Sequence, residues 1–169
     1  MEYLKNKDNH RIVSVWDEEN SDRFSVGRIV ASDEDYTVME TLTVDGNTNG
    51  LYMTCTESIF CIKENDRYTQ SVKKLFEKRE RAFEVFDLRS GTPLKVFLNY
   101  SKEKNRLISV KLCNEETITG RIIEIFDDSI LIKAFDENGY DGEAEISTNS
   151  IVCWRCNSHY ERNIEVLNQ

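Results

Sequence analysis

Two cysteines near the C-terminal end have a spacing that metal and redox sites use. They enclose two residues in the stretch Cys153-Trp154-Arg155-Cys156. A zinc site needs about four ligands, and the chain supplies no second CxxC or histidine pair. A redox CxxC opens a helix, whereas this one lies on or just after an apolar run typical of a strand. We interpret both cysteines as residues that pack in a strand, and a metal or redox role is the alternative.

Neighbouring acidic residues are the next candidates for chemistry. Asp127-Asp128 and Glu34-Asp35 each interrupt an apolar run. Two adjacent carboxylates suit acid–base catalysis or cation binding, but Asp at a hairpin tip commonly bonds its own backbone. No calcium-loop pattern accompanies these acids. We interpret them as turn residues, and a small hydrolase that uses them is the alternative.

The other residues able to do chemistry form no catalytic pattern. His10 and His159 are the only histidines, and no Ser-His-Asp or Cys-His arrangement is evident from the spacing. Cys113 and Ser150 are the nucleophiles that folding could still bring beside a base. We predict no catalytic residue, no metal and no cofactor, and therefore no enzyme.

A basic helix is the strongest candidate for contact with nucleic acid. Apolar residues at helical spacing predict this helix over residues 67–86. Acidic residues interleave with the basic ones at i,i+3 or i,i+4 spacing, which favours a solvated, salt-bridged face. The apolar residues are Val72, Leu75, Phe76, Phe83 and Phe86, the basic ones Lys73, Lys74, Lys78, Arg79 and Arg81, and the acidic ones Glu77, Glu80 and Glu84.

The elements that must position these residues occur in two similar sets. The matching segments are "RIVSV" at 11–15 with "RLISV" at 106–110, "GRIV" at 27–30 with "GRII" at 120–123, and "TESIFCIKENDRY" at 56–68 with "TNSIVCWRCNSHY" at 148–160. Several matches in the same order favour duplication over convergence of two β-rich segments. Shared serine, cysteine and tyrosine positions strengthen this, because β propensity does not demand them.

Alternating apolar residues predict five strands in the second set, over residues 106–112, 117–126, 129–135, 143–147 and 150–154. Residues 136–142, which include Asn138-Gly139 and Gly142, predict a loop. Five short strands avoid long unpaired edges if they close into a small, bent barrel. Gly27 and Gly120 lie inside the second strand of each set, where such a barrel bends.

A second helix is predicted over residues 93–103. Thr92 can cap its free amides, and Pro93 suits the first helical position because that position needs no amide donor. The connection at 88–93, "LRSGTP", is short and contains Gly, Ser and Pro. We therefore expect the two halves to pack together, each burying its own apolar residues.

The second set resembles the Sm-like family, which includes bacterial Sm-like RNA chaperones. The resemblance rests on "GRIIEIFDDSILIK" followed by "AEISTNSIVCW"; it covers residues 107–154 and, more weakly, 12–62. It implies a helix followed by five strands, and pairing of the fourth strand of one barrel with the fifth of its neighbour. We expect the second copy to cover the first copy's edge in this way. The basic pair and the Asn and Arg-Gly motifs of the family are missing, so its uridine binding is not implied.

Composition and charge limit the partners. The chain has 169 residues, 31% charged residues and a net charge of −9, and both halves contain excess acid, which disfavours a surface that grips phosphates. It contains no apolar run of about eighteen residues and no apolar core of a secretory signal, so we expect a cytoplasmic protein with reduced cysteines. We expect no contact with membranes.

These observations predict a mainly β protein of two tandem, five-stranded, SH3-like or Sm-like small barrels with flanking helices. Residues 1–88 form the first barrel and its C-terminal helix, and residues 89–169 form the second barrel with an N-terminal helix. The function expected is the docking of a protein partner; RNA or oligonucleotide binding is the alternative, and a homo-oligomer remains an option. The residues predicted to bind a partner or RNA are Asp35, Tyr36, Thr56, Glu57, Asp128, Ser129, Thr148 and Asn149.

Overall fold

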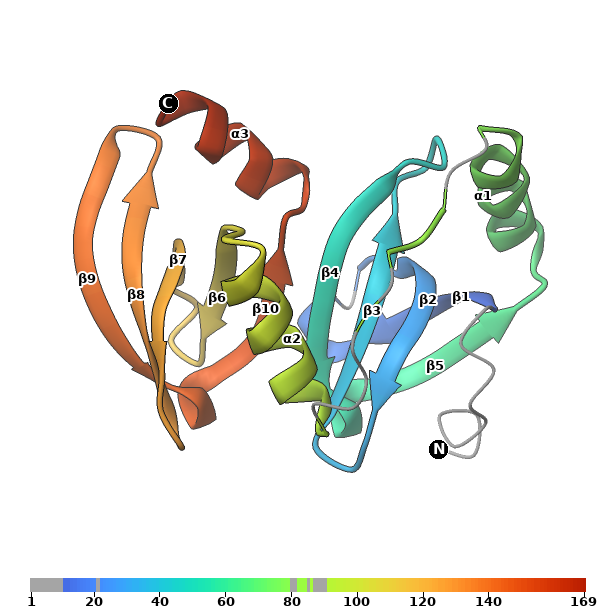
Figure 1. Ribbon diagram of the computed structural model, residues 1–169. Coiled ribbons are helices and arrows are strands. Elements are labelled where there is room, and N and C mark those ends of the chain that lie inside the picture. Colours follow the sequence, from blue (N-terminus) through green and yellow to red (C-terminus); the bar gives the residue numbers. More distant parts are fainter. Residues whose placement is uncertain (1–10, 21, 80–81, 85, 87–90) are drawn as a thin grey trace.

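A computed structural model describes residues 11–20, 22–79, 82–84, 86 and 91–169 of the chain. Within these residues, ten strands form one antiparallel sheet and three α-helices lie against it (Figure 1). The prediction of a mainly β protein is confirmed. The strands are β1 (Ile12–Asp17), β2 (Ser25–Ser32), β3 (Tyr36–Leu42), β4 (Thr48–Cys55), β5 (Ile59–Glu64), β6 (Ile108–Leu112), β7 (Thr117–Ile125), β8 (Ser129–Asp136), β9 (Gly139–Ser147) and β10 (Ile151–Cys156).

The sheet has the order β5-β1-β2-β3-β4-β10-β6-β7-β8-β9. Each half therefore uses the same internal order, and the halves meet where β4 pairs with β10. In this joint Met53 lies opposite Trp154 and Tyr52 opposite Arg155, which is the predicted pairing of a fourth strand with a fifth. The order is linear, with β5 and β9 at its two ends, so the ladders of the described residues do not confirm two closed barrels.

Backbone irregularities recur at equivalent places in the two halves. The register shifts between Ile29 and Ala31 in the β2–β3 ladder, and between Ile122 and Glu124 in the β7–β8 ladder. The residue before the cap of the following helix has a positive φ in both halves, 62° at Asn65 and 56° at Asn157. The segments matched by sequence thus adopt the same local structure.

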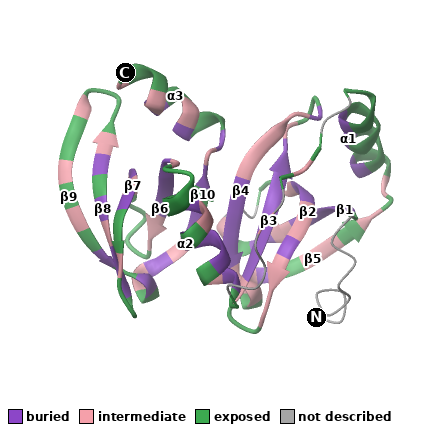
Figure 2. Ribbon diagram, viewed as in Figure 1, coloured by how far each residue is buried: buried purple, intermediate pink, exposed green. Residues whose placement is uncertain are grey.

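The largest core cluster combines both halves, so the expectation that each half buries only its own apolar residues is wrong for this cluster. The helix α2 (Pro93–Glu103) lies where the halves meet and packs against β2, β3 and β7 (Figure 1). Figure 2 shows buried positions along most of β3 and along the second half of β4. The cluster includes Val38, Leu51 and Met53 from the first half, Val96, Phe97 and Leu98 from α2, and Ile108, Val110, Ile130, Ile132 and Trp154 from the second half.

The helix α1 (Arg67–Lys78) is shorter than the helix predicted over residues 67–86. It begins where the Asp66 side chain accepts hydrogen bonds from the backbone N–H groups of Tyr68 and Thr69. Phe83 lies beyond the helix end, yet its ring stacks on that of Phe76 at 4.5 Å. The apolar spacing that predicted a longer helix is therefore satisfied by a non-helical segment that folds back on α1.

The remaining predictions for local structure have mixed outcomes. The helix predicted over residues 93–103 is confirmed as α2, with Thr92 capping it. The loop predicted over residues 136–142 is wrong, because β9 begins at Gly139 after a tight turn. The helix α3 (His159–Leu167) had not been predicted. Any helix before β1 and part of the connection at 88–93 fall outside the described residues.

Candidate functional site

The residues predicted to bind a partner meet in pairs in both halves. In the first half, the Thr56 N–H donates a hydrogen bond to the Asp35 carbonyl oxygen at 2.9 Å. In the second half, the Thr148 N–H donates to the Asp128 carbonyl oxygen, also at 2.9 Å. Each bond ties a hairpin tip, β2–β3 or β7–β8, to the short 3-10 helix that follows β4 or β9. The fold therefore builds two equivalent junctions around four of the eight predicted residues, and the other four, Tyr36, Glu57, Ser129 and Asn149, are their neighbours along the chain.

Side-chain hydroxyls strengthen these junctions differently. In the first half, the hydroxyls of Thr37 and Thr56 lie 2.9 Å apart. In the second half, the Thr148 hydroxyl donates directly to the Asp128 carbonyl oxygen at 3.1 Å. The first tip is also closed by Asp33, whose carboxylate accepts from the backbone N–H groups of Asp35 and Tyr36. Glu34 and Asp35 lie in the turn, as predicted, but the carboxylate that bonds the backbone is that of Asp33, which was not among the predicted residues.

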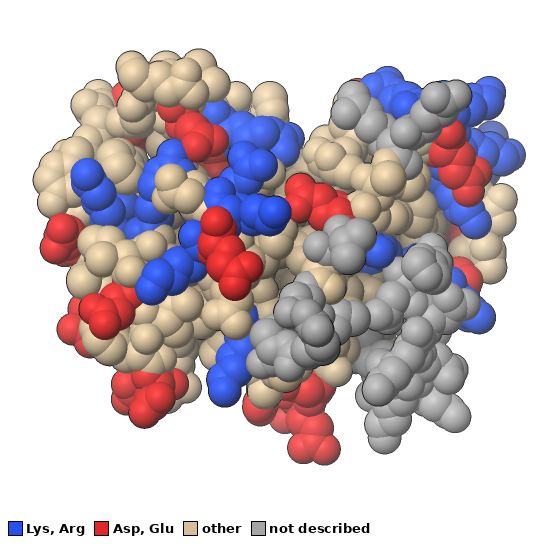
Figure 3. Space-filling view, viewed as in Figure 1, with Lys and Arg blue, Asp and Glu red and all other residues tan. Residues whose placement is uncertain are grey.

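The carboxylates at both junctions face solvent. We define the first acidic tip as Glu34, Asp35 and Glu57, and the second acidic tip as Asp127 and Asp128; all five residues are exposed. Both hairpin tips lie at the lower end of the molecule in Figure 1, and Figure 3 shows acidic side chains gathered at the lower end of each half. Two negatively charged protrusions therefore point to the same side.

Aromatic and hydroxyl groups at the tips are less available than the carboxylates. Tyr36 is half-buried, and burial is the main cause that raises the pKa of its hydroxyl. Ser129 is buried, and its hydroxyl donates to Glu145 Oε1 at 2.9 Å. Phe126, by contrast, is 43% exposed beside the second acidic tip. The tips thus present acid and one aromatic face.

The CxxC cysteines lie within β10 as buried side chains. Cys153 and Cys156 are free thiols, and burial raises their pKa values to about 11 and about 12. Reactive cysteines and metal-binding cysteines are thiolates, which these surroundings disfavour. Across the described parts of the chain, no three His, Cys, Asp or Glu residues are grouped to hold a metal ion. The geometry agrees with strand packing.

The histidine and the adjacent acids considered for catalysis are exposed where the structure describes them. His159 is exposed at the start of α3, and its backbone N–H donates to the Asn49 side-chain oxygen at 2.8 Å. His10 lies outside the described residues. Asp127 and Asp128 are exposed at a tip where solvent surrounds them.

None of the helices that the structure describes is long and apolar enough to cross a membrane.

The predicted salt-bridged face of α1 is present in part. Lys73 and Glu77 form an i,i+4 ion pair at 3.9 Å. Arg79 lies 3.7 Å from the Asp45 carboxylate, and its guanidinium also donates to the Asn47 side chain at 2.8 Å. These contacts offset some of the positive charge on the helix. Residues 80 and 81, which belong to the predicted face, lie outside the described residues.

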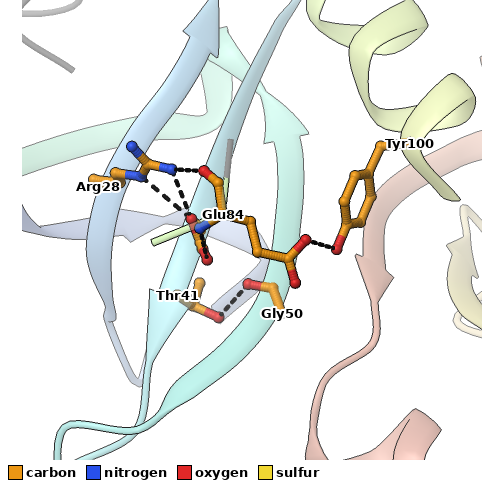
Figure 4. A network of polar contacts seen from close by, with 6 residues as sticks. Arg28, Thr41, Gly50, Glu84 and Tyr100 are labelled. Carbon is orange, nitrogen blue, oxygen red and sulfur yellow. Dashed lines mark hydrogen bonds and ion pairs between the residues drawn. The ribbon is translucent and has the colours of Figure 1, made fainter. Parts of the chain in front are cut away.

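A partly buried polar network in the first half was missed by sequence reasoning. Glu40 on β3 is 3% exposed; one carboxylate oxygen accepts from Arg28 Nη2 at 2.9 Å and the other from the Glu84 N–H at 3.1 Å. The Tyr100 hydroxyl of α2 donates to the Glu84 carboxylate at 2.5 Å (Figure 4). The Arg28 guanidinium also lies over the Phe83 ring, 4.5 Å from its centroid.

This network attaches the segment after α1 to the sheet and to α2. Burial is the main cause that raises the pKa of Glu40, and its hydrogen bonds to the Glu84 backbone and to Arg28 oppose that rise. Arg28 and Glu40 are direct cross-strand partners in the β2–β3 ladder. Knowledge of the strand register would therefore have revealed the pair. We interpret the network as structural, since its buried member, Glu40, is bonded by Arg28 and by the Glu84 backbone of the same chain.

Comparison with known proteins gives no relative for this chain. No family model, no curated protein and no solved structure matches it. The two acidic tips are therefore judged on their geometry and charge alone.

Proposed function

We propose that the protein is a non-enzymatic, cytoplasmic docking protein whose two acidic tips bind a basic protein partner. The observation that carries the proposal is the recurrence of one junction, with its backbone bond of 2.9 Å, beneath exposed carboxylates in both halves. A rigid junction holds the charges in place. Two such tips on one side of the molecule would steer a basic surface toward it and select its orientation.

We further propose that the two halves are tandem copies of an Sm-like small barrel, one over residues 1–88 and the other over residues 89–169. The shared strand order, the equivalent register shifts and the β4–β10 joint support this proposal. The binding role does not depend on it. The uridine-binding motifs of the Sm-like family are missing here, so the proposed barrel architecture carries no RNA activity with it.

RNA is the weaker candidate partner because the tips repel phosphate. Binding to a phosphate backbone is driven by Lys and Arg that displace counterions. Three of the eight residues named for RNA contact are themselves exposed carboxylates, and Glu34 and Asp127 add two more. A basic peptide gains from those carboxylates, whereas an oligonucleotide must overcome them.

The test compares two probes on the full-length protein. A fluorescent peptide of eight alternating Lys-Gly pairs represents a flexible basic segment, and a fluorescent oligouridine represents RNA; binding is followed by anisotropy over a salt series. One variant replaces the first acidic tip (Glu34→Gln, Asp35→Asn, Glu57→Gln), and another the second (Asp127→Asn, Asp128→Asn). The control, Glu103→Gln with Glu137→Gln, removes two exposed charges elsewhere.

We expect the peptide to bind at low salt, each tip variant to weaken binding about tenfold, and the control to retain it. Oligouridine should not bind even at low salt. The proposal fails if both tip variants bind the peptide like the wild type. It also fails if the protein binds oligouridine with a steep salt dependence and does not bind the peptide.

A further inference from the structure

The last strand of the sheet, β9, has an open edge. In the ladders of the described residues, β9 pairs with β8 alone, through eight of its nine residues. In an antiparallel pair, alternate residues direct their backbone N–H and C=O groups away from the partner strand. Such a row of groups is a template on which another strand can form.

The joint between the halves shows how an equivalent edge is filled. β4 and β9 are equivalent because each leads directly into a 3-10 helix, Thr56–Ser58 or Thr148–Ser150. On β4, the edge is covered by β10, which places Cys156 opposite Leu51 and Trp154 opposite Met53. All four of these side chains are buried. An apolar strand therefore docks on an apolar edge at the joint.

The equivalent positions of β9 carry acid. Counting back from the 3-10 helices, Leu51 corresponds to Glu143 and Met53 to Glu145, and both glutamates are exposed. The Ser129 hydroxyl donates to Glu145 Oε1 at 2.9 Å, which orients that carboxylate. On β8, Lys133 lies opposite Glu143, but its ammonium lies over the Tyr140 ring, 5.1 Å from the centroid.

A second copy of the chain suits this edge poorly. The strand equivalent to β10 is β5, at the other end of the sheet. In the register of the joint, β5 would place Glu64 opposite Glu143 and Ile62 opposite Glu145. Like charges directly opposite one another destabilise a ladder, and an isoleucine over a carboxylate removes its water without replacing it. Glu64 is moreover already paired with Arg11 of its own chain, at 3.4 Å.

We propose that the β9 edge is a docking site for an extended, basic segment of a partner protein, which adds to the sheet beside β9. Lys or Arg of the segment would lie opposite Glu143 and Glu145, where opposite charges across a ladder stabilise it. Backbone hydrogen bonds along the open edge supply affinity, and the two carboxylates supply specificity. This site is separate from the acidic tips and does not depend on them.

The test uses a fluorescent peptide of four Arg-Val pairs, blocked at both ends, and the full-length protein. A second peptide has the same sequence with N-methyl groups on alternate residues, which removes the donors of one edge and keeps the charge. The variant Glu143→Gln with Glu145→Gln removes the two carboxylates, and Glu103→Gln with Glu137→Gln is the charge-matched control. Binding is measured by anisotropy and located by amide hydrogen exchange.

We expect the Arg-Val peptide to bind, N-methylation to weaken binding at least tenfold, and the Glu143/Glu145 variant to do the same. The control should bind like the wild type, and bound peptide should slow hydrogen exchange in β9. Circular dichroism should be unchanged in both variants, since all four residues are exposed.

Four results would overturn the proposal. If the N-methylated peptide bound as tightly as the unmethylated one, the peptide would be held by its charge and not as an added strand. Loss of binding only in the acidic-tip variants would support the proposed function and exclude the β9 edge. If the Glu143/Glu145 variant bound the peptide like the wild type, the two carboxylates would have no role in recognition. Self-association of the wild type with protection of β9, unaffected by peptide, would assign the edge to a second copy.

Discussion

Gly27 on β2 lies directly against the backbone carbonyl of Glu40 on β3, so closely that a Cβ atom at Gly27 would overlap the carbonyl oxygen. The same relationship recurs in the second half between Gly120 and the carbonyl of Lys133. The sequence marked these two glycines as positions where a strand bends. The structure adds that each lets the neighbouring strand approach where no side chain fits.

Replacement of Gly120 by Ala should lower the free energy of unfolding by about 1–3 kcal/mol, because the new methyl group forces the two strands apart. Gly27→Ala should have a similar effect. Urea unfolding followed by circular dichroism measures both. Gly91→Ala is the contrasting substitution, since Gly91 has a φ of 102° and no atom within 4 Å of its Cβ position, whereas Gly120 has the overlap without a positive φ. If Gly120→Ala were as stable as the wild type, the close approach of Gly120 to the Lys133 carbonyl would be contradicted.

The Glu40 carboxyl should make stability depend on pH. Burial raises the pKa of Glu40 above its ordinary value of 4.5, so the folded protein holds this proton more tightly than the unfolded chain does. The group's contribution to stability is therefore largest below about pH 4.5 and falls as pH rises through the raised pKa. Relative to Glu40→Gln, which does not titrate, the wild type should lose stability over that range.

Urea unfolding of the wild type and Glu40→Gln at several pH values tests this expectation. The exposed Glu124→Gln serves as the control and should show no such trend. A difference between wild type and Glu40→Gln that grows in favour of the wild type as pH rises would show the opposite sign, and with it a carboxylate stabilised mainly by Arg28.

Glu161 should stabilise the end of the second half through two buried hydrogen bonds. It is 1% exposed; its Oε2 accepts from the Ser158 N–H and its Oε1 from the Ser109 hydroxyl, each at 2.6 Å. Glu161→Ala leaves the Ser158 N–H unpaired and leaves the Ser109 hydroxyl with the Thr119 hydroxyl, 2.8 Å away, so it should cost about 1–3 kcal/mol of unfolding free energy. Faster amide exchange in α3 should accompany the loss. Glu161→Gln keeps one acceptor and should cost less; an equal cost would refute this assignment.

The five cysteines should differ widely in reactivity. Cys113 is exposed, whereas burial raises the pKa of Cys153 to about 11 and that of Cys156 to about 12. Iodoacetamide at pH 8 should therefore modify Cys113 within minutes, and Cys156 only after unfolding in urea. Mass spectrometry of proteolytic fragments measures the modified sites. Rapid modification of both CxxC cysteines in the folded protein would revive the redox alternative.

Much of the candidate site could be predicted from the sequence, because turn chemistry is local. Adjacent acids between apolar runs predict hairpin tips. The Thr-x-Ser segments recur in both halves and therefore predict a second pair of equivalent binding positions. Their contact, through the Thr56 and Thr148 amides, needed the folded chain. Glu40 was missed, since a single acid within an apolar strand does not reveal whether it faces water or an arginine on the next strand.

Local errors in the fold have similar causes. Helical spacing predicted α1 but extended it too far, because Phe83 satisfies the same apolar contact from a non-helical segment. α3 was missed although two signals were present: the capping box of Ser158 with Glu161, and the match between Tyr160 and Tyr68 of α1. Because α1 follows β5, comparison of the halves would have predicted an equivalent helix, α3, after β10.

The order of residues by itself determined the strands, their inward and outward positions and the resemblance between the two halves. These properties depend on neighbours along the chain, since alternation with a period of two fixes which side of a strand is apolar. The pairing of β4 with β10 was expected only through the resemblance to the Sm-like family. The tertiary structure alone decided that α2 joins the halves in one core and that β5 and β9 are left at the ends. The reason is that every strand carries the same backbone donors and acceptors along its edges, so the choice of neighbour depends on packing and charge across the whole folded chain.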